Sequence, residues 1–132
     1  MSTENTARVK LELEYSLNSS PHILFQYISN PSGLQAWFAD HVDVAGPQRY
    51  KFTWDDDTEY VATMTKNVTN KYVRFHIEGY PDSEYLEFRI EQDDITNDVE
   101  LMITEFVNAN EAEMAASIWD VAVENLCSII GA

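Results

Sequence analysis

The chain has 132 residues, of which 45% are hydrophobic and 12% aromatic, and this is enough for the core of one domain spanning residues 1–132. Its 23 acidic residues against 8 basic ones give a formal net charge of −15, which argues against nucleic-acid or anionic-membrane partners. The start of the sequence has no apolar leader, and no apolar run reaches the roughly 20 residues of a membrane helix. We therefore expect a cytoplasmic protein whose residues 1–7 form a disordered tail.

One strand and two short helices are predicted at the start of the domain. Residues 8–17 alternate strictly between apolar and polar side chains, which is typical of a half-buried strand. The pairs at residues 20–21 (Ser-Pro) and 30–31 (Asn-Pro) each provide an N-cap and a proline at the first helical position. Each pair predicts a short helix, and the second helix carries Trp37 and Phe38.

The middle of the chain returns to strand patterns. Short alternating segments are separated by turns rich in Gly, Pro, Asn and Asp, as in an antiparallel meander. The predicted strands comprise residues 42–44, 49–54, 59–65, 72–77, 85–90 and 99–106.

A long C-terminal helix is predicted over residues 111–130, with Asn110 as its N-cap and Glu113 completing a capping box. Its polar side chains fall in one stripe about 80° wide, and nearly all others are apolar. So narrow a polar stripe predicts that a curved sheet wraps around the helix. Ala115 and Ala122 lie opposite the stripe, where small side chains allow either close packing or an internal space.

Two stretches resemble a known family. Residues 20–42, SPHILFQYISNPSGLQAWFADHV, resemble the opening of Aha-type domains (activator of heat-shock-protein ATPase homologue) in the START-like, or SRPBCC, superfamily. The matching positions of "P-x-x-L-x-x-W-F" are Pro31, Leu34, Trp37 and Phe38. The segment ASIWDVAVENL resembles the family's Trp followed by a helix that runs to a Leu, here Trp119 and Leu126. The chain is thus similar to a bacterial START-like domain of the Aha type.

The resemblance implies an α+β helix-grip fold, in which a curved antiparallel sheet of about seven strands wraps around the long C-terminal helix. It also implies a cavity between sheet and helix that takes apolar or aromatic molecules. Strand alternation and the helix pattern suggest its lining, with Trp37 at the rim, although packing alone is the favoured role of Trp37 and Phe38. The predicted ligand-binding residues are Trp37, Phe52, Trp54, Phe75, Phe88, Ile103, Ile118, Ala122 and Asn125.

The sequence indicates no catalytic residue, cofactor or metal. Its three histidines are scattered without ligand spacing, and residues 55–57 (Asp-Asp-Asp) lack the spacing of a calcium loop. Glu105 shares the core side of its strand with Ile103, where burial would raise the pKa of its carboxyl group. The alternative, which we favour, is that the strand bulges or ends near Glu105.

Three functions remain open. We favour a non-enzymatic START-like domain that binds a small apolar or aromatic ligand. The second is a co-chaperone-like interaction module whose acidic surface binds a basic protein partner. The third is a cyclase-like or hydrolase-like enzyme using Glu105 and a tyrosine such as Tyr50, and the lack of a visible polar cluster disfavours it.

Overall fold

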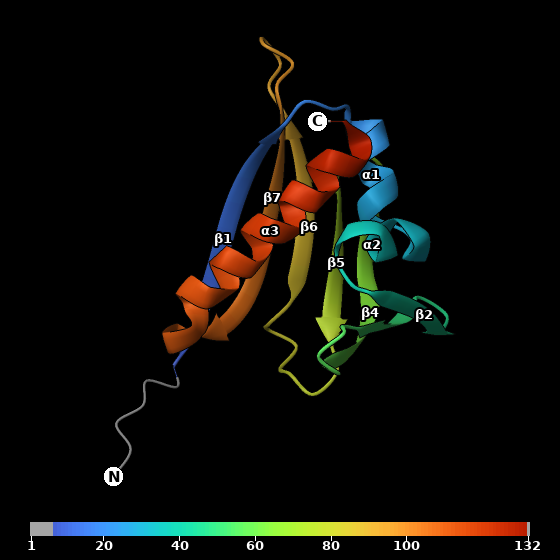
Figure 1. Ribbon diagram of the computed structural model, residues 1–132, viewed down its shortest axis with the longest axis vertical. Helices are drawn as coiled ribbons and strands as arrows, with labels where there is room; N and C mark the ends of the chain where they lie inside the picture. The colour runs from blue at the N-terminus through green and yellow to red at the C-terminus, as the bar shows by residue number, and fades with distance from the viewer. Residues whose placement is uncertain (1–6, 132) are drawn as a thin grey trace.

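The computed structural model describes residues 7–131, and its elements follow the predicted order (Figure 1). Strand β1 is followed by two short helices, six further strands, a one-turn 3₁₀ helix and a long helix. The tail expected at residues 1–7 lies outside the described part except for Ala7, whose carbonyl accepts a hydrogen bond from the Ala109 N–H at 2.8 Å. The elements are β1 (Arg8–Leu17), α1 (Pro21–Ile28), α2 (Pro31–Trp37), β2 (His41–Gly46), β3 (Arg49–Thr53), β4 (Glu59–Val68), β5 (Tyr72–Ile77), β6 (Leu86–Gln92), β7 (Val99–Asn108), η1 (Ala109–Glu111) and α3 (Ala112–Ile130).

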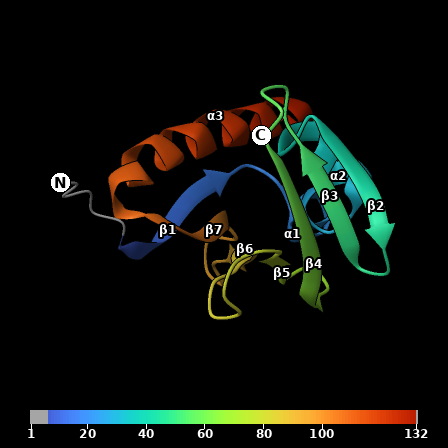
Figure 2. The same ribbon diagram turned by 90° about the horizontal axis from the view of Figure 1, so that it is seen from below.

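The strands form one seven-stranded antiparallel sheet in the order β1-β7-β6-β5-β4-β3-β2. Each strand from β2 to β7 pairs with its sequence neighbour, and β1 closes against β7. Figure 2 shows that the sheet is curved. Strand β1 lies beneath α3, whereas β4, β3 and β2 lie toward the other end of the sheet. The curved sheet of about seven strands with a long C-terminal helix is confirmed.

The two short helices begin as predicted. The Ser20 side chain accepts a hydrogen bond from the Ile23 N–H at 3.2 Å, and the Asn30 side chain accepts one from the Gly33 N–H at 2.9 Å. A proline follows each cap, where its missing N–H has no intrahelical partner to lose.

The core lies on the concave side of the sheet. Its largest fully buried side chains come from the strands, the two short helices and α3, and they include Phe52, Phe75, Phe88, Leu24 and Leu126. The rings meet edge to face, with 5.9 Å between the centroids of Phe52 and Phe75. This aromatic layer is the floor on which the candidate site is built.

The start of α3 differs from the prediction. Asn110 lies inside the 3₁₀ helix η1, and no side-chain hydrogen bond caps either η1 or α3. The predicted capping box is therefore wrong. The chain passes directly from β7 through η1 into α3, so the backbone turn takes the place of a side-chain cap. At its other end α3 stops at Gly131, whose φ of 74° is the left-handed conformation that glycine adopts readily.

The sheet does not enclose α3. The helix packs against β1, β7 and α2 through one buried face that carries Trp119, Val123 and Leu126. Its other apolar side remains open, and Met114 and Ile118 are 67% and 62% exposed. The sheet and α3 form the predicted helix grip, but α3 lies over one limb of the curved sheet, so the apolar side that the narrow polar stripe predicted to be covered is open instead. The strands opposite it are left uncovered.

Candidate functional site

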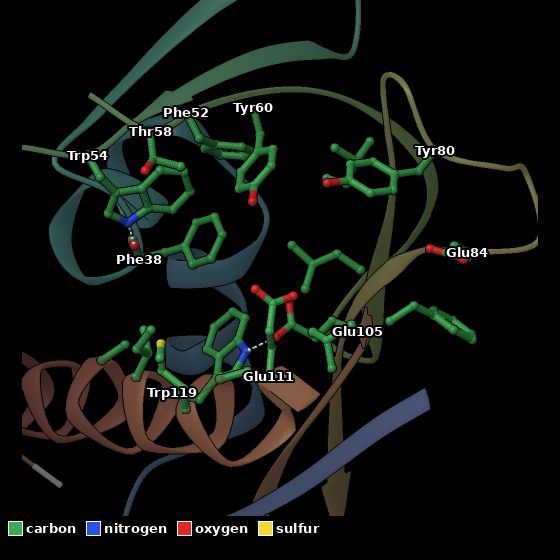
Figure 3. A pocket seen from close by; sticks show the side chains of 18 of the residues that line it. Phe38, Phe52, Trp54, Thr58, Tyr60, Tyr80, Glu84, Glu105, Glu111 and Trp119 are labelled. Carbon is green, nitrogen blue, oxygen red and sulfur yellow. Dashed lines mark hydrogen bonds between the residues drawn. The ribbon is translucent and has the colours of Figure 1, made fainter. Parts of the chain in front are cut away.

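A pocket of about 440 Å³ lies between the uncovered strands and α3 (Figure 3). It occurs because α3 covers β1 and β7 but leaves the inner face of β3 and β4 free. Its aromatic and aliphatic lining includes Phe38, Phe52, Trp54, Tyr60, Ile77, Tyr80, Tyr85, Leu86, Phe106, Met114, Ile118, Trp119 and Ala122, and its charged lining comprises Arg8, Asp56, Glu84, Glu105 and Glu111.

Phe38, the residue that ends α2, organises the aromatic end of the pocket. Its ring stacks on Trp119, with centroids 5.4 Å apart and planes 12° from parallel. It meets Phe52 and Trp54 edge to face at 5.1 and 5.3 Å. Trp54 in turn contacts Tyr60 at 5.7 Å. Helix α2, the β3–β4 hairpin and α3 are therefore joined by a continuous series of rings.

Hydrogen bonds hold the indole rings in place. The Trp54 Nε1–H donates to the Phe38 carbonyl at 2.9 Å, and the Trp119 Nε1–H donates to Glu105 Oε1 at 2.7 Å. Beside the pocket, the Trp37 Nε1–H donates to the Tyr27 carbonyl at 2.8 Å. Because each N–H has a partner, the aromatic walls are preorganised.

Glu105 is the half-buried carboxylate of the pocket. Strand β7 continues to Asn108 without a register shift, and Glu105 stands opposite Leu11 on the same side of the sheet as Ile103. The bulge or strand end that we favoured near Glu105 is therefore wrong. Burial raises the pKa of the Glu105 carboxyl group, while the hydrogen bond from Trp119 and the charge of Arg8 oppose that rise.

The basic side chain of the pocket is already paired. The Arg8 guanidinium donates to Glu84 Oε1 at 2.7 Å through Nη2 and contacts both Glu84 oxygens through Nε at 3.2 Å. Arg8 also donates to Asn108 Oδ1 and to the Phe106 carbonyl, both at 3.0 Å. Arg8 thus binds Glu84 directly, and its charge also acts on Glu105 and Glu111.

The structure divides the predicted ligand-binding residues into three groups. Phe52, Trp54, Ile118 and Ala122 line the pocket. Trp37 and Asn125 line an adjoining, more open hollow between α2 and α3, which Trp54, Ile118 and Ala122 also border. The remaining predictions, Phe75, Phe88 and Ile103, are buried in the floor below, and none of the three borders the pocket or the hollow.

Sequence reasoning missed other lining residues. Tyr60 pairs with Phe52 across β3 and β4, and directly paired residues point to the same face of a sheet. Strand alternation was therefore a signal that could have identified Tyr60. Tyr80 and Glu111 come from a loop and from η1, where no periodic pattern predicts the direction of a side chain. Tyr50, the tyrosine we had paired with Glu105, packs 6.1 Å from Phe75 and does not line the pocket.

Neither a metal cluster nor a membrane-spanning helix occurs within residues 7–131. No group of three or more His, Cys, Asp and Glu side chains there is arranged to hold a metal ion. In the same part of the chain, no helix has the length and apolar character needed to cross a membrane.

The raised pKa of Glu105 predicts a pH-dependent stability. In the folded protein the pKa of the Glu105 carboxyl group lies above its ordinary value of 4.5, so the folded state binds this proton more tightly than the unfolded chain does. The resulting stabilisation is fully present only at pH values below 4.5. That stability is lost as the pH rises through the folded-state pKa, by about 1.4 kcal/mol for each tenfold difference in proton affinity between the folded and unfolded chain.

Glu105→Gln keeps the acceptor for Trp119 but does not ionise. The variant should therefore gain stability relative to the unmodified protein as pH rises from about 4 to 8, and chemical denaturation would measure it. A difference independent of pH would contradict the assignment.

Comparison with known proteins identifies the family. A family model described as a START-like superfamily domain matches residues 5–132. The solution structure of BfR322 from Bacteroides fragilis is 34% identical, with 93% of this chain and 91% of that chain covered and a TM-score of 0.62. No curated protein matches the sequence.

Two more distant structures share the fold. The Aha1 dimer from Colwellia psychrerythraea is 21% identical, with 89% of this chain and 92% of that chain covered and a TM-score of 0.73. MLL2253 from Mesorhizobium loti is 14% identical, with 93% and 97% covered and a TM-score of 0.74. The predicted resemblance is thereby confirmed, and the chain belongs to the START-like superfamily.

Proposed function

We propose that this protein binds a small, largely apolar or aromatic molecule between its sheet and α3. The observation that carries the proposal is the pocket of about 440 Å³ whose walls are mainly aromatic and aliphatic side chains. Its volume falls within the range of small-molecule sites, which are mostly apolar with a few polar groups that orient the ligand. The unpaired Cys127 agrees with the cytoplasmic location expected from the sequence.

The arrangement of the pocket supports a planar or compact ligand. The edges and faces of Phe38, Trp54 and Trp119 are fixed by hydrogen bonds and ring contacts before any ligand arrives. A ligand therefore loses little affinity to the ordering of these walls. The exposed side chains of Met114 and Ile118 stand at the mouth, where a bound apolar group would cover them.

The test is to fill the pocket. Ala122 borders both the pocket and the adjoining hollow, so Ala122→Phe should occupy ligand space with little loss of stability. In a thermal-shift screen of apolar and aromatic compounds, a ligand at 100 times its Kd should stabilise the unmodified protein by about 2.7 kcal/mol. The Ala122→Phe variant should lose that protection.

Ser128→Phe is the matched control, because it adds the same ring at an exposed position of α3 that borders neither space. The control should keep the thermal protection. Severe destabilisation by Ala122→Phe, together with no stabilising compound in the screen, would mean that the interior works only as a packed core.

A second candidate is an interaction module, favoured by the exposed apolar side of α3. Met114, Ile118 and Val121 are 59–67% exposed and adjoin the acidic side chains of Glu113 and Asp120. Such a surface suits a partner with an apolar segment flanked by basic residues. Binding of a basic, apolar peptide that survives Ala122→Phe but is lost on Ile118→Asp would favour this candidate over the pocket.

A further inference from the structure

The charges at the pocket restrict which ligands it can take. Beside the aromatic rings, the lining contains the carboxylates of Glu105, Glu111, Asp56 and Glu84 and one basic side chain, Arg8. Arg8 is bound by Glu84 and stacks over the Tyr80 ring at 5.3 Å. The lining therefore carries four carboxylates against one guanidinium, and although the charge of Arg8 also acts on Glu105 and Glu111, negative charge is in excess around the pocket. A ligand with a carboxylate or phosphate would meet repulsion from these groups, and most strongly from Glu105, the carboxylate that is shielded from water.

The polar groups converge on one part of the pocket. Figure 3 shows the hydroxyl groups of Tyr60 and Tyr80 pointing toward one another near the side chains of Glu105 and Glu111. The pKa of Tyr60 is raised, first by burial and then by its electrostatic interactions with Tyr80, Glu105 and Glu111. Tyr60 therefore stays a neutral phenol that can turn its oxygen lone pairs toward a positive group.

Aromatic rings adjoin the same carboxylates. Trp119 donates its N–H to Glu105 and stacks its ring on Phe38, and Tyr60 continues the wall through its contact with Trp54. Indole and phenol faces attract cations through their negative electrostatic potential, and this attraction grows when the site is desolvated. A carboxylate held in an apolar pocket also gains most from a cation placed beside it, because few other groups there offset its charge.

From this juxtaposition we infer that the ligand is an organic cation, with an ammonium group attached to an aromatic or compact apolar body. The inference rests on the proposed function, since it concerns the ligand of the same pocket. The ammonium group lies between the Glu105 carboxylate and the aromatic rings, and the apolar body lies against Phe38, Phe52 and Trp54.

The test compares two probes of nearly identical shape. Benzyltrimethylammonium carries a permanent positive charge, and neopentylbenzene replaces its nitrogen with carbon. Binding is measured at mildly alkaline pH by tryptophan fluorescence, since Trp54 and Trp119 both line the pocket, and by thermal shift. We expect the cation to bind at least about tenfold more tightly, equivalent to about 1.4 kcal/mol.

Two variants with the same net charge test whether Glu105 itself binds the cation. Glu105→Gln should weaken binding of the cation about tenfold or more, as expected for loss of a charge-assisted contact, and leave the neutral probe unchanged. Glu113→Gln removes the same charge from an exposed position of α3 outside the pocket lining and should leave both probes unchanged. Binding of the neutral probe also reports that each variant is folded.

The outcomes separate the two proposals. If neopentylbenzene binds as tightly as the cation, the inference is overturned while the apolar pocket stands. If Glu105→Gln and Glu113→Gln weaken the cation equally, the net charge of the protein and not Glu105 attracts it, and the inference also fails. If neither probe binds and no compound of the wider screen does, the proposed function itself is contradicted.

Discussion

Replacing Trp119 with Ala should lower the free energy of unfolding by about 3–5 kcal/mol, the usual cost of removing a large buried aromatic side chain. Trp119 is only 6% exposed, although it belongs to a helix with a largely open apolar side. Its ring contacts Trp37, Phe38 and Phe88 at centroid distances of 5.4–6.3 Å. The substitution thus removes the side chain that joins α3 to both α2 and the sheet.

The loss has a second consequence in the pocket. Without the Trp119 N–H, Glu105 loses the hydrogen bond that opposes the rise of its pKa. Removal of the ring also reduces the burial that raises this pKa, so the two changes act on the pKa of Glu105 in opposite directions.

Urea denaturation would measure the loss of stability, with Ile118→Ala as the control on the same helix. Ile118 is mostly exposed, so that substitution should cost about 0.5 kcal/mol or less. A loss below about 1 kcal/mol for Trp119→Ala would show that α3 is not anchored through this ring.

Replacing Gly33 with Ala should also be severely destabilising, by about 3 kcal/mol or more, because the new methyl group has no space. A Cβ at this position would overlap the Gln26 carbonyl oxygen and would lie 2.7 Å from the Tyr27 Cα. Both are backbone atoms of α1, so no side-chain rotation relieves the contact. Helix α2 must move away from α1, and the Phe38 ring that ends α2 moves with it.

The direction of the stability change distinguishes a steric clash at Gly33 from an effect of helix propensity. Gly33 lies inside α2, where helix propensity alone predicts that alanine stabilises by about 1 kcal/mol. Ser32→Ala, at the exposed neighbouring position, should change stability by about 0.5 kcal/mol or less. Thermal unfolding of both variants would check the prediction, and a gain in Tm for Gly33→Ala would contradict the close approach of the two helices.

Trp37 and Phe38 are adjacent in the sequence but differ in their burial and in the side chains that they contact. Trp37 is buried and anchors α2 through its N–H to the Tyr27 carbonyl. Phe38 is half-buried and faces the pocket. Because adjacent residues at the end of a helix point in different directions, the position of α3 determines that Phe38 and not Trp37 faces the pocket.

The sequence by itself determined the elements and their order. Strict alternation at residues 8–17, the two caps before proline, and turn residues between short apolar runs are local signals, and each acts over a few neighbouring residues. They led to the seven strands and the helices, and family resemblance supplied the grip arrangement that the structure confirms.

Only the tertiary structure decided which limb of the sheet α3 covers, and with it the site. The helix pattern placed Ile118 and Asn125 on the inner side, yet both are exposed, because burial follows the position of the helix on the sheet rather than its apolar stripe alone. The same position exposes Glu105 to the pocket and brings Tyr80 and Glu111 to it from irregular segments. These contacts join residues far apart in the sequence, and their geometry depends on packing between elements, which no local periodicity encodes.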